Sequence, residues 1–557
     1  MPIIRSLCGQ CGMGCGLRVV TGEGRHLSIA GDPVHPANMG QLCGASDTLS
    51  DMIALDGRLL RPMIDGRTVG WDRAVGHVAR RLSATIARHG PGSVALFAGG
   101  GLVTEDYYVA NKLIKGFIGS AHIDAPGIGA LGIGAAQRMA YGEDVGPTTY
   151  EDMAQAELLL LVGTGPVRRH PLLLERIAAV REAQGMRVML VGQTVERLDG
   201  VLAAEADLHL AVAPGSEEML IAGLLLYCRE TGVVDEEFMA RHVTVPPGFW
   251  QGLAAGHDLW SVARACGCSP GDIRAFYEAV AGTRRLMTVA SPSGEGDAAR
   301  RLGSAIINVH LTTGRIGRPG AAPLLMGRAA NGMGAREVGC WSGELAAHRD
   351  FSAGAIAQVG RFWGATTMAS GAGLAGEALA QAVKQGRIKA LLMLGGLPPA
   401  DHPLRALLDR VPLLILTTPW AEAVGGSKMV ALPSPPWIEK DGTLTAADRL
   451  ISRQRHLLPL PGEAKPDWWT LTRIARAMGW HDAFHYERAA EIYREHGRLT
   501  AYGHDGRRLL NLKRHAPISN PAYQELTPWR WGEVPFDEGR FPSPDGKARL
   551  VPSWDQA

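Results

Sequence analysis

The sequence CGQCGMGCG, residues 8–16, places three cysteines on one short glycine-rich loop. A fourth cysteine follows the third after 27 intervening residues. A four-iron, four-sulfur cluster requires one thiolate for each iron, and a cysteine-rich loop can supply three of them together. The spacing therefore predicts a small N-terminal domain that holds a 4Fe-4S cluster through Cys8, Cys11, Cys15 and Cys43. The interleaved glycines would let this loop wrap closely around the cluster.

A structural zinc ion is the alternative occupant of the same four thiolates. Zinc sites more often pair two Cys-x2-Cys knuckles, so the spacing favours iron and sulfur. The other cysteines are scattered along the chain and are interpreted as buried or incidental thiols: Cys228, Cys266, Cys268 and Cys340.

Length and composition exclude several classes of protein. A chain of 557 residues is long enough for several domains, and 46% hydrophobic with 20% charged residues is typical of a globular protein in water. The net charge of +2 is too small for the basic surface of a nucleic-acid-binding protein. The sequence has no signal-peptide pattern and no apolar run near the ~20 residues that span a bilayer. We therefore expect a cytoplasmic protein without a membrane span.

Short apolar runs that end in glycine or proline alternate with helical stretches along most of the chain. This pattern is typical of parallel strands buried on both faces in α/β sheets. In such sheets, ligands bind beyond the carboxyl ends of the strands. The predicted strands are residues 94–98, 158–162, 187–191, 207–212, 391–394 and 413–416.

The cysteine spacing, together with five later segments, resembles the molybdopterin oxidoreductases, and within them the catalytic subunit of assimilatory nitrate reductase. The likeness covers nearly the whole chain. The matching segments are Thr104-EDYY with Lys112, Leu311-TTGRIGRPGA, Asn331-GMGAREVG, Glu439-KDGTLT and Pro461-GEAKPDWW.

The resemblance implies a multidomain α/β fold in which two parallel-sheet domains each hold one molybdopterin guanine dinucleotide. The predicted domains are a cluster domain at 1–58, a discontinuous α/β domain at 59–155 and 300–450, an inserted α/β domain at 156–299, and a C-terminal segment at 451–557 that packs on the others. The barrel domain that closes over the pterins in this family would begin where the sequence stops, so the expected fold is the family fold without it.

The sequence departs from the family pattern where the molybdenum should bind. The resemblance places a molybdenum-binding cysteine a few residues after Asp124, but residues 125–134 read APGIGALGIG and contain no metal ligand. A lysine that follows the fourth cluster cysteine in the family is replaced by Ala45. We therefore expect a degenerate molybdenum site, with a bound pterin cofactor possible but doubtful.

The remaining candidate residues come from the same resemblance. The positions matched to cofactor binding are Gly163, Thr164, Arg168, Gly215, Ser216, Glu217 and Asn331. Arg168 would hold a phosphate or belong to a solvated basic loop. Met333 and Arg336 match a substrate funnel, where the guanidinium would attract an oxyanion. Alternatively, their glycine-rich turn packs the two α/β domains together and Arg336 pairs with a nearby surface acid.

Three functional hypotheses follow. The first is an iron-sulfur redox subunit that passes electrons through its 4Fe-4S cluster to or from a ferredoxin, a flavodoxin, a flavin reductase or other subunits of a redox complex. The second is an active nitrate reductase-like enzyme whose missing pterin domain comes from another subunit. The third is a structural or regulatory protein whose cluster is architectural.

Overall fold

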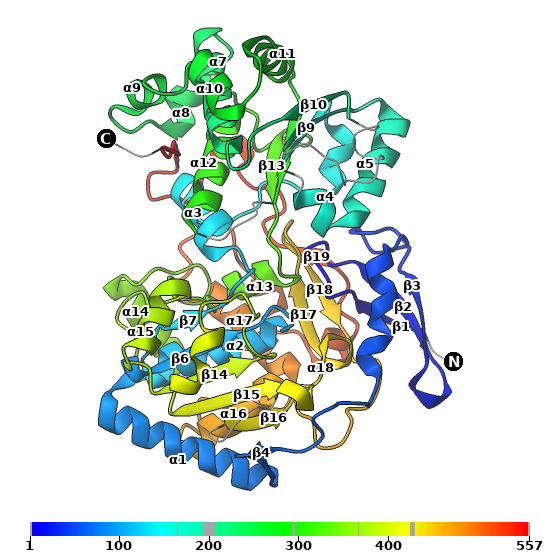
Figure 1. The fold of residues 1–557 in the computed structure, drawn as a ribbon, viewed down its shortest axis with the longest axis vertical. Coiled ribbons are helices and arrows are strands. Elements are labelled where there is room, and N and C mark those ends of the chain that lie inside the picture. The colour runs from blue at the N-terminus through cyan, green and yellow to red at the C-terminus, as the bar shows by residue number, and fades with distance from the viewer. Residues whose placement is uncertain are drawn as a thin grey trace.

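The computed structural model describes residues 3–163, 165–192, 206–291, 296–365, 367–423 and 429–554. Two largely parallel sheets with helices on their faces form most of the molecule, and a small antiparallel sheet lies at the N-terminus (Figure 1). The predicted mixed α/β fold with parallel sheets is confirmed.

The N-terminal sheet contains the antiparallel strands β1 (Ile3–Leu7), β2 (Gly16–Thr21) and β3 (Leu27–Gly31). The cysteine loop joins β1 to β2, directly after the last residue pair of that ladder, Leu7 with Gly16. The 3-10 helix η2 (Gly44–Leu49) begins immediately after Cys43. The N-terminal sheet thus fixes both ends of the loop that carries three of the four cysteines.

A seven-stranded sheet has the strand order β5-β4-β16-β15-β14-β6-β7. Its five parallel strands are β16 (Met429–Pro433), β15 (Leu413–Thr418), β14 (Ala390–Leu394), β6 (Val94–Ala98) and β7 (Ile123–Asp124), and the short β4 (Met63–Ile64) and β5 (Arg67–Thr68) add an antiparallel edge.

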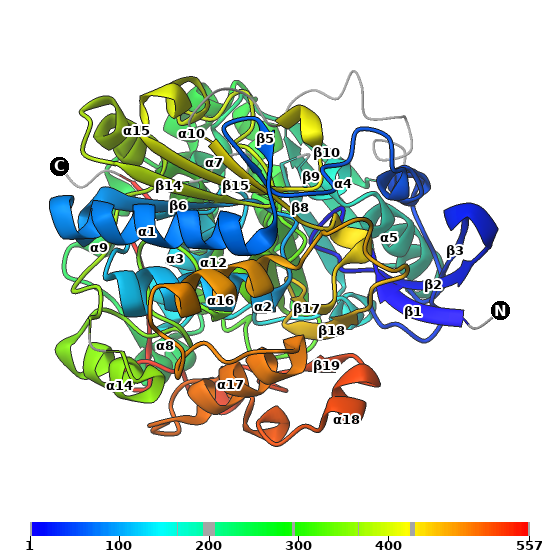
Figure 2. The same cartoon turned by 90° about the horizontal axis from the view of Figure 1, so that it is seen from below.

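Side-chain alternation along these strands supplies two hydrophobic layers. Leu96 and Leu392 pack in one layer with Val78 of helix α1 (Trp71–His89). This layer also includes residues of helices α2 (Thr104–Asn111) and α16 (Asp467–Ala477). Phe97 and Met393 point the other way and pack with helix α15 (Gly376–Lys384). Figure 2 shows α1 and α15 on opposite sides of the sheet.

A five-stranded, fully parallel sheet forms the second α/β unit. Its order is β10 (Leu208–Ala211), β9 (Arg187–Gly192), β8 (Leu158–Val162), β12 (Leu286–Ala290) and β13 (Ala322–Leu325). Helices α7 (Glu217–Glu230) and α12 (Asp297–Thr312) contact each other beside it. Because β13 pairs with β12, this sheet extends beyond the predicted boundary at residue 299.

The C-terminal segment contacts all of these units. Strand β18 (Leu450–Gln454) forms a hairpin with β17 (Gly442–Thr445) and also pairs with β19 (Trp529–Arg530). Further on, β20 (Ala548–Arg549) pairs with β11 (Val243–Thr244) of the second α/β unit. In Figure 1, β17 and β18 lie beside the N-terminal sheet. Among the described residues, no helix has both the length and the apolar character needed to cross a bilayer.

Candidate cluster and cofactor site

The thiols of the four N-terminal cysteines interact electrostatically with one another. Burial, together with the nearby Cys43, raises the pKa of Cys8 to about 11, and burial together with Cys8 and Cys43 raises that of Cys11 to about 12. Burial and the other three thiols also raise the pKa of Cys15. Thiolates this close would repel one another, so Cys8, Cys11 and Cys15 require the positive charge of bound metal to stay ionised.

The loop between the cysteines is closed by short backbone contacts. The amide of Cys8 donates to the carbonyl of Cys15 at 2.9 Å, and the amide of Gly14 donates to the carbonyl of Cys11 at 3.4 Å. Gly14 has a φ of +65°, a conformation that glycine adopts without the strain that a Cβ brings. These bonds hold the three cysteines on one tight turn.

Side chains from distant segments press against the glycines of this loop. A Cβ built on Gly9 would lie 2.3 Å from the ring of Trp437, whose indole nitrogen donates to the carbonyl of Leu7 at 3.0 Å. A Cβ on Gly16 would lie 2.4 Å from His35. Glycine is therefore required where the loop meets Trp437 and His35.

The donor set fits a 4Fe-4S cluster, because one loop carries three thiols, Cys43 interacts electrostatically with all three, and each iron takes one thiolate. In the described part of the chain, no three His, Cys, Asp or Glu side chains converge as the ligands of a single ion would. Four thiolates that bind four separate irons do not need to converge on a single point.

The loop expected to carry a molybdenum ligand follows β7. Asp124 accepts a hydrogen bond from the amide of Gly376 at 2.9 Å. The carbonyl of Gly127 accepts from the amides of Arg328 and Ala329, at 3.1 and 2.9 Å. These bonds attach the loop to the glycine-rich turn that precedes Arg336.

Arg336 is buried and its guanidinium is bound by protein groups. Its Nε donates to Oδ2 of Asp144 at 2.5 Å, and Nη1 donates to the carbonyl of Ile128. Nη2 lies 3.5 Å from the sulfur of Met333. Burial alone would raise the pKa of Asp144, but Arg336 and Arg138 together hold that pKa below its usual value. The carboxylate is therefore ionised, and it is a buried acid rather than the surface acid suggested by the sequence.

Further charged groups lie around this pair. Arg138 donates to Glu344 at 2.9 Å, and its guanidinium lies 4.5 Å from the ring centroid of Trp341. His348 pairs with Glu143 at 2.9 Å, with both side chains buried. Sequence reasoning missed all of these residues, because they come from separate segments and match no motif.

The predicted nucleotide-binding residues lie near the carboxyl ends of strands β8 and β10. Gly163 follows β8 with a φ of +75°, and Arg168 is exposed near the end of helix α4 (Gly165–Arg169). Gly215 has a φ of +81°, Ser216 donates to the carbonyl of Ala213 at 2.7 Å, and Glu217 begins α7. This is the sheet edge where α/β proteins bind ligands. Thr164 lies outside the described residues.

Asn331 lies apart from that edge and is fully buried. Its amide nitrogen donates to the carbonyl of Leu102 at 3.1 Å, and its side-chain oxygen accepts from the amide of Thr445 at 2.9 Å. The side chain thus connects the segment before α2 to strand β17.

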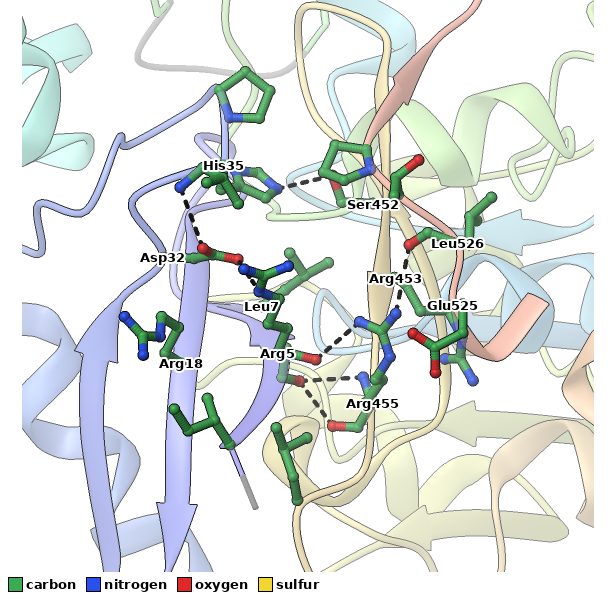
Figure 3. A pocket seen from close by; sticks show the side chains of 17 residues that line it. Arg5, Leu7, Arg18, Asp32, His35, Ser452, Arg453, Arg455, Glu525 and Leu526 are labelled. Atoms are coloured by element: carbon green, nitrogen blue, oxygen red, sulfur yellow. Dashed lines mark hydrogen bonds and ion pairs between the residues drawn. The ribbon is translucent and has the colours of Figure 1, made fainter. Parts of the chain in front are cut away.

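A pocket of about 950 Å³ opens between β1 and the C-terminal segment (Figure 3). Among its lining residues, Ile3 is 51% and Val34 is 66% exposed. Arg5 pairs with Asp32 at 3.3 Å, whereas the guanidinium of Arg18 has no ion pair or hydrogen bond with any described residue. The pocket therefore combines exposed apolar groups with an uncompensated cation, Arg18, which lies three residues after Cys15.

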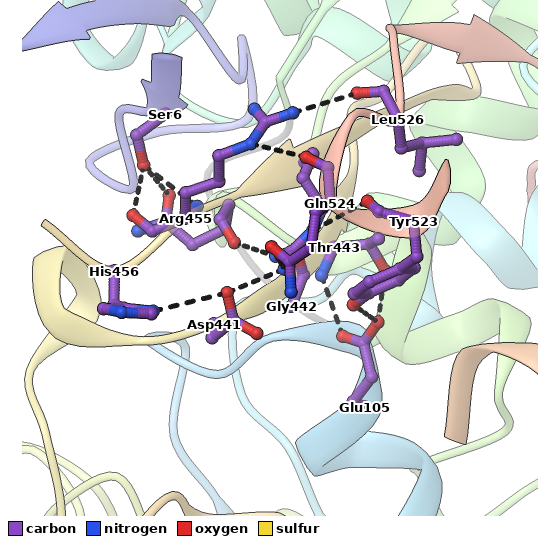
Figure 4. A network of polar contacts seen from close by, with 12 residues as sticks. Ser6, Glu105, Asp441, Gly442, Thr443, Arg455, His456, Tyr523, Gln524 and Leu526 are labelled. Carbon is purple, nitrogen blue, oxygen red and sulfur yellow. Dashed lines mark hydrogen bonds and ion pairs between the residues drawn. The ribbon is translucent and has the colours of Figure 1, made fainter. Parts of the chain in front are cut away.

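A polar network holds one wall of this pocket in place (Figure 4). Ser6 of β1 donates to the carbonyl of Arg455 at 2.7 Å, and Arg455 donates to the carbonyl of Gln524 at 2.8 Å. Tyr523 donates to Glu105 of α2 at 2.7 Å. Burial raises the pKa of Glu105 to about 7. The network joins the cluster domain, the C-terminal segment and the seven-stranded sheet.

A loop with three cysteines and a fourth from a later segment, on a small antiparallel sheet beside two parallel α/β sheets, define a multidomain iron-sulfur protein of the oxidoreductase type. The chain belongs to the molybdopterin oxidoreductase family. The family model for molybdopterin oxidoreductase matches residues 58–477, and the model for the molybdopterin oxidoreductase Fe4S4 domain matches residues 1–54.

Two nitrate reductases are similar along almost the whole chain. The one from Klebsiella oxytoca is 37% identical over 99% of this chain, and the one from Shewanella frigidimarina is 33% identical over 99%. The chain spans 64% and 61% of the length of these relatives. An acetylene hydratase from Pelobacter acetylenicus shares the fold, with a TM-score of 0.75 at 16% identity, over 98% of this chain and 77% of that one.

Proposed function

We propose that this protein is an iron-sulfur redox subunit of the nitrate reductase-like kind, which transfers electrons through one 4Fe-4S cluster and has a degenerate molybdenum site. The observation that carries the proposal is the contact of Arg336 with Asp144 and the carbonyl of Ile128. These contacts occupy the guanidinium that would otherwise bind an oxyanion. The contact with Ile128 also fixes the position of a loop that has no metal-ligating side chain.

The residues present do not fit a molybdenum-pterin cofactor at this loop. Residues 125–134 offer only alanine, proline, glycine, isoleucine and leucine side chains, none of which binds a metal. Met333 and Arg336 are each 3% exposed and contact each other. A substrate anion would have to displace Asp144, a buried and ionised partner, which costs several kcal/mol.

The thiols fit the iron-sulfur cluster, which when bound stores and releases single electrons. The chain's own groups bind and shield it. Cys8 and Cys15 are buried, and Trp437 and His35 cover the loop on the sides where Gly9 and Gly16 lie. Cys11 and Cys43 are partly exposed, so this side of the loop is the accessible one.

A second candidate function is supported by one observation. Arg449 is fully buried at the tip of the β17–β18 hairpin, and its Nε and one terminal nitrogen have no partner among the described residues. Burial lowers the pKa of this guanidinium to about 9. An anionic cofactor would pair it, which favours a molybdenum enzyme whose closing domain comes from another polypeptide.

Metal analysis separates these functions. We expect the anaerobically purified protein to contain about four irons per chain, and less than one tenth of an equivalent of molybdenum or pterin. The cluster should be reduced by dithionite and give an EPR signal. Stoichiometric molybdenum would establish the second candidate instead, and a full cluster that dithionite cannot reduce would indicate an architectural role.

The pocket beside β1 is the proposed docking surface for an acidic redox partner such as a ferredoxin or flavodoxin. Exposed Ile3 and Val34 supply apolar contact, and Arg18 and Arg5 supply positive charge. Apolar contact surrounded by complementary charge is what a transient protein interface uses.

Reversing the charge of Arg18 tests this surface. With a reduced, negatively charged [2Fe-2S] ferredoxin as the probe, Arg18→Glu should slow cluster reduction about tenfold at low ionic strength, because steering by charge is lost. The difference should shrink in 0.5 M salt. The matched control, Arg264→Glu, lies on an exposed helix of the second α/β unit and should change the rate less than twofold. Equal rates for Arg18→Glu and wild type would place the partner elsewhere.

A further inference from the structure

His170 is a buried histidine that the proposed function does not use. It follows helix α4 and directly precedes α5 (Pro171–Gln184). Its side chain is fully buried, and neither ring nitrogen has a hydrogen-bond partner among the described residues. A buried polar group without a partner costs about 1–3 kcal/mol. A group outside the described polypeptide is therefore required to satisfy it.

The imidazole lies against the cysteine loop. A Cβ built on Gly12 would lie 3.5 Å from Cε1 of His170 and 3.3 Å from the carbonyl oxygen of Gly327. Gly12 directly follows Cys11 and comes three residues before Cys15. The ring thus packs on the loop at a glycine that lies between the predicted cluster ligands Cys11 and Cys15.

Three backbone carbonyls of the loop already accept hydrogen bonds. The carbonyl of Gly12 accepts from the hydroxyl of Tyr150 at 3.4 Å and from the amide of Ala447 at 3.5 Å. The carbonyls of Cys11 and Cys15 accept amides from within the loop. A cluster held by these cysteines would bring its sulfurs, which accept hydrogen bonds, to this side of the loop.

We infer that the imidazole N–H of His170 donates a hydrogen bond to a sulfur of the cluster held by Cys8, Cys11, Cys15 and Cys43, and so sets its reduction potential. In this role His170 is a positioning residue that acts on the cluster through a hydrogen bond, and it does not bind iron. A donor to sulfur stabilises the reduced cluster more than the oxidised one, because reduction adds negative charge. The inference rests on the cluster of the proposed function and is independent of the molybdenum site.

The first test is the midpoint potential, measured by EPR-monitored titration of the full chain. In His170→Leu the ratio of reduced to oxidised cluster at a fixed potential should fall about tenfold, which is 59 mV for a one-electron couple. His170→Asn and His170→Gln return an N–H near the Nδ1 and Nε2 positions, and one of them should recover at least half of the shift. An unchanged potential in His170→Leu with four irons bound would overturn the inference.

His35 supplies a matched control beside the same loop. It is also buried, but its Nε2 lies 3.0 Å from the hydroxyl of Ser452, and its Nδ1 accepts from the amide of Ala37 at 3.3 Å. Both nitrogens are therefore occupied by protein groups, so His35→Gln changes the cover of the loop without removing a free N–H, and it should shift the potential much less than His170→Leu does. Equal shifts in the His35 and His170 variants would indicate general packing and would overturn the inference.

The second test needs no variant to fold. Pulsed EPR of the dithionite-reduced wild type, labelled with ¹⁵N-histidine, should show one ¹⁵N hyperfine coupling and one proton coupling that is lost in D₂O. An exchangeable proton without ¹⁵N coupling would assign the position to a water molecule and overturn the inference. A chain with no reducible cluster would instead refute the proposed function itself.

Discussion

Cys11→Ser should lose the cluster almost completely, with bound iron falling from about four to below one per chain. A serine oxygen is a poor replacement for a thiolate at this metal, and the remaining three thiols cannot complete the cube. Because metal binding and local folding are linked, the small N-terminal domain should also become sensitive to protease. Iron and acid-labile sulfide analysis, with limited proteolysis, measures both effects.

Cys268→Ser is the matched control for this variant. Cys268 lies in the second α/β unit, partly exposed, where its thiol contacts the carbonyl of Ala211 at 2.9 Å. Its loss should leave the iron content unchanged. If Cys11→Ser retained four irons, the ligand set would be wrong; if Cys268→Ser lost them, the assay would be reporting general instability.

Asp144→Asn should lower the free energy of unfolding by about 3–5 kcal/mol, because it leaves the buried guanidinium of Arg336 without its counter-charge. The change keeps the shape of the side chain and removes only the charge. Equilibrium urea unfolding, monitored by fluorescence and far-UV circular dichroism, measures the loss.

Two comparisons make this result specific. Asp297→Asn breaks the exposed ion pair with Arg300 and should cost less than about 1 kcal/mol. The double variant Asp144→Asn with Arg336→Met removes both charges and should recover most of the lost stability. A loss below about 1 kcal/mol in Asp144→Asn alone would show that the Arg336 contact is weak, which would remove the main support for a closed molybdenum site.

The sequence was sufficient for the family, the mixed α/β fold and most of the strands, whereas the four cluster ligands stay a prediction. Cysteine spacing is a local pattern, and its chemistry is restrictive enough to name a cofactor. The apolar runs at 94–98 and 158–162 also carry their own signal, because strands buried on both faces need continuous hydrophobic residues. Both kinds of feature depend on residues that are close together along the chain.

Strand β13 escaped prediction for a physical reason. It is four residues long and contains Pro323, which lacks the N–H that a ladder needs. The strand lies at the edge of its sheet, where one side needs no partner. A short proline-containing edge strand gives no clear pattern, so the predicted boundary of the second α/β unit fell too early.

The environment of Arg336 also could not be predicted from the sequence. Arg336 and Asp144 are 192 positions apart, and no local pattern pairs them. The sequence offered either an oxyanion or a surface acid as the partner of this guanidinium. Only the packing of the loop after β7 against the glycine-rich turn brings a buried carboxylate to it.

The covering of the cysteine loop by Trp437 dictates an order of biogenesis. Residues that close over Gly9 are synthesised more than 400 positions after the thiols they bury. Because Cys8 and Cys15 are buried in the folded chain, we expect iron and sulfide to reach these two thiols before Trp437 closes over Gly9.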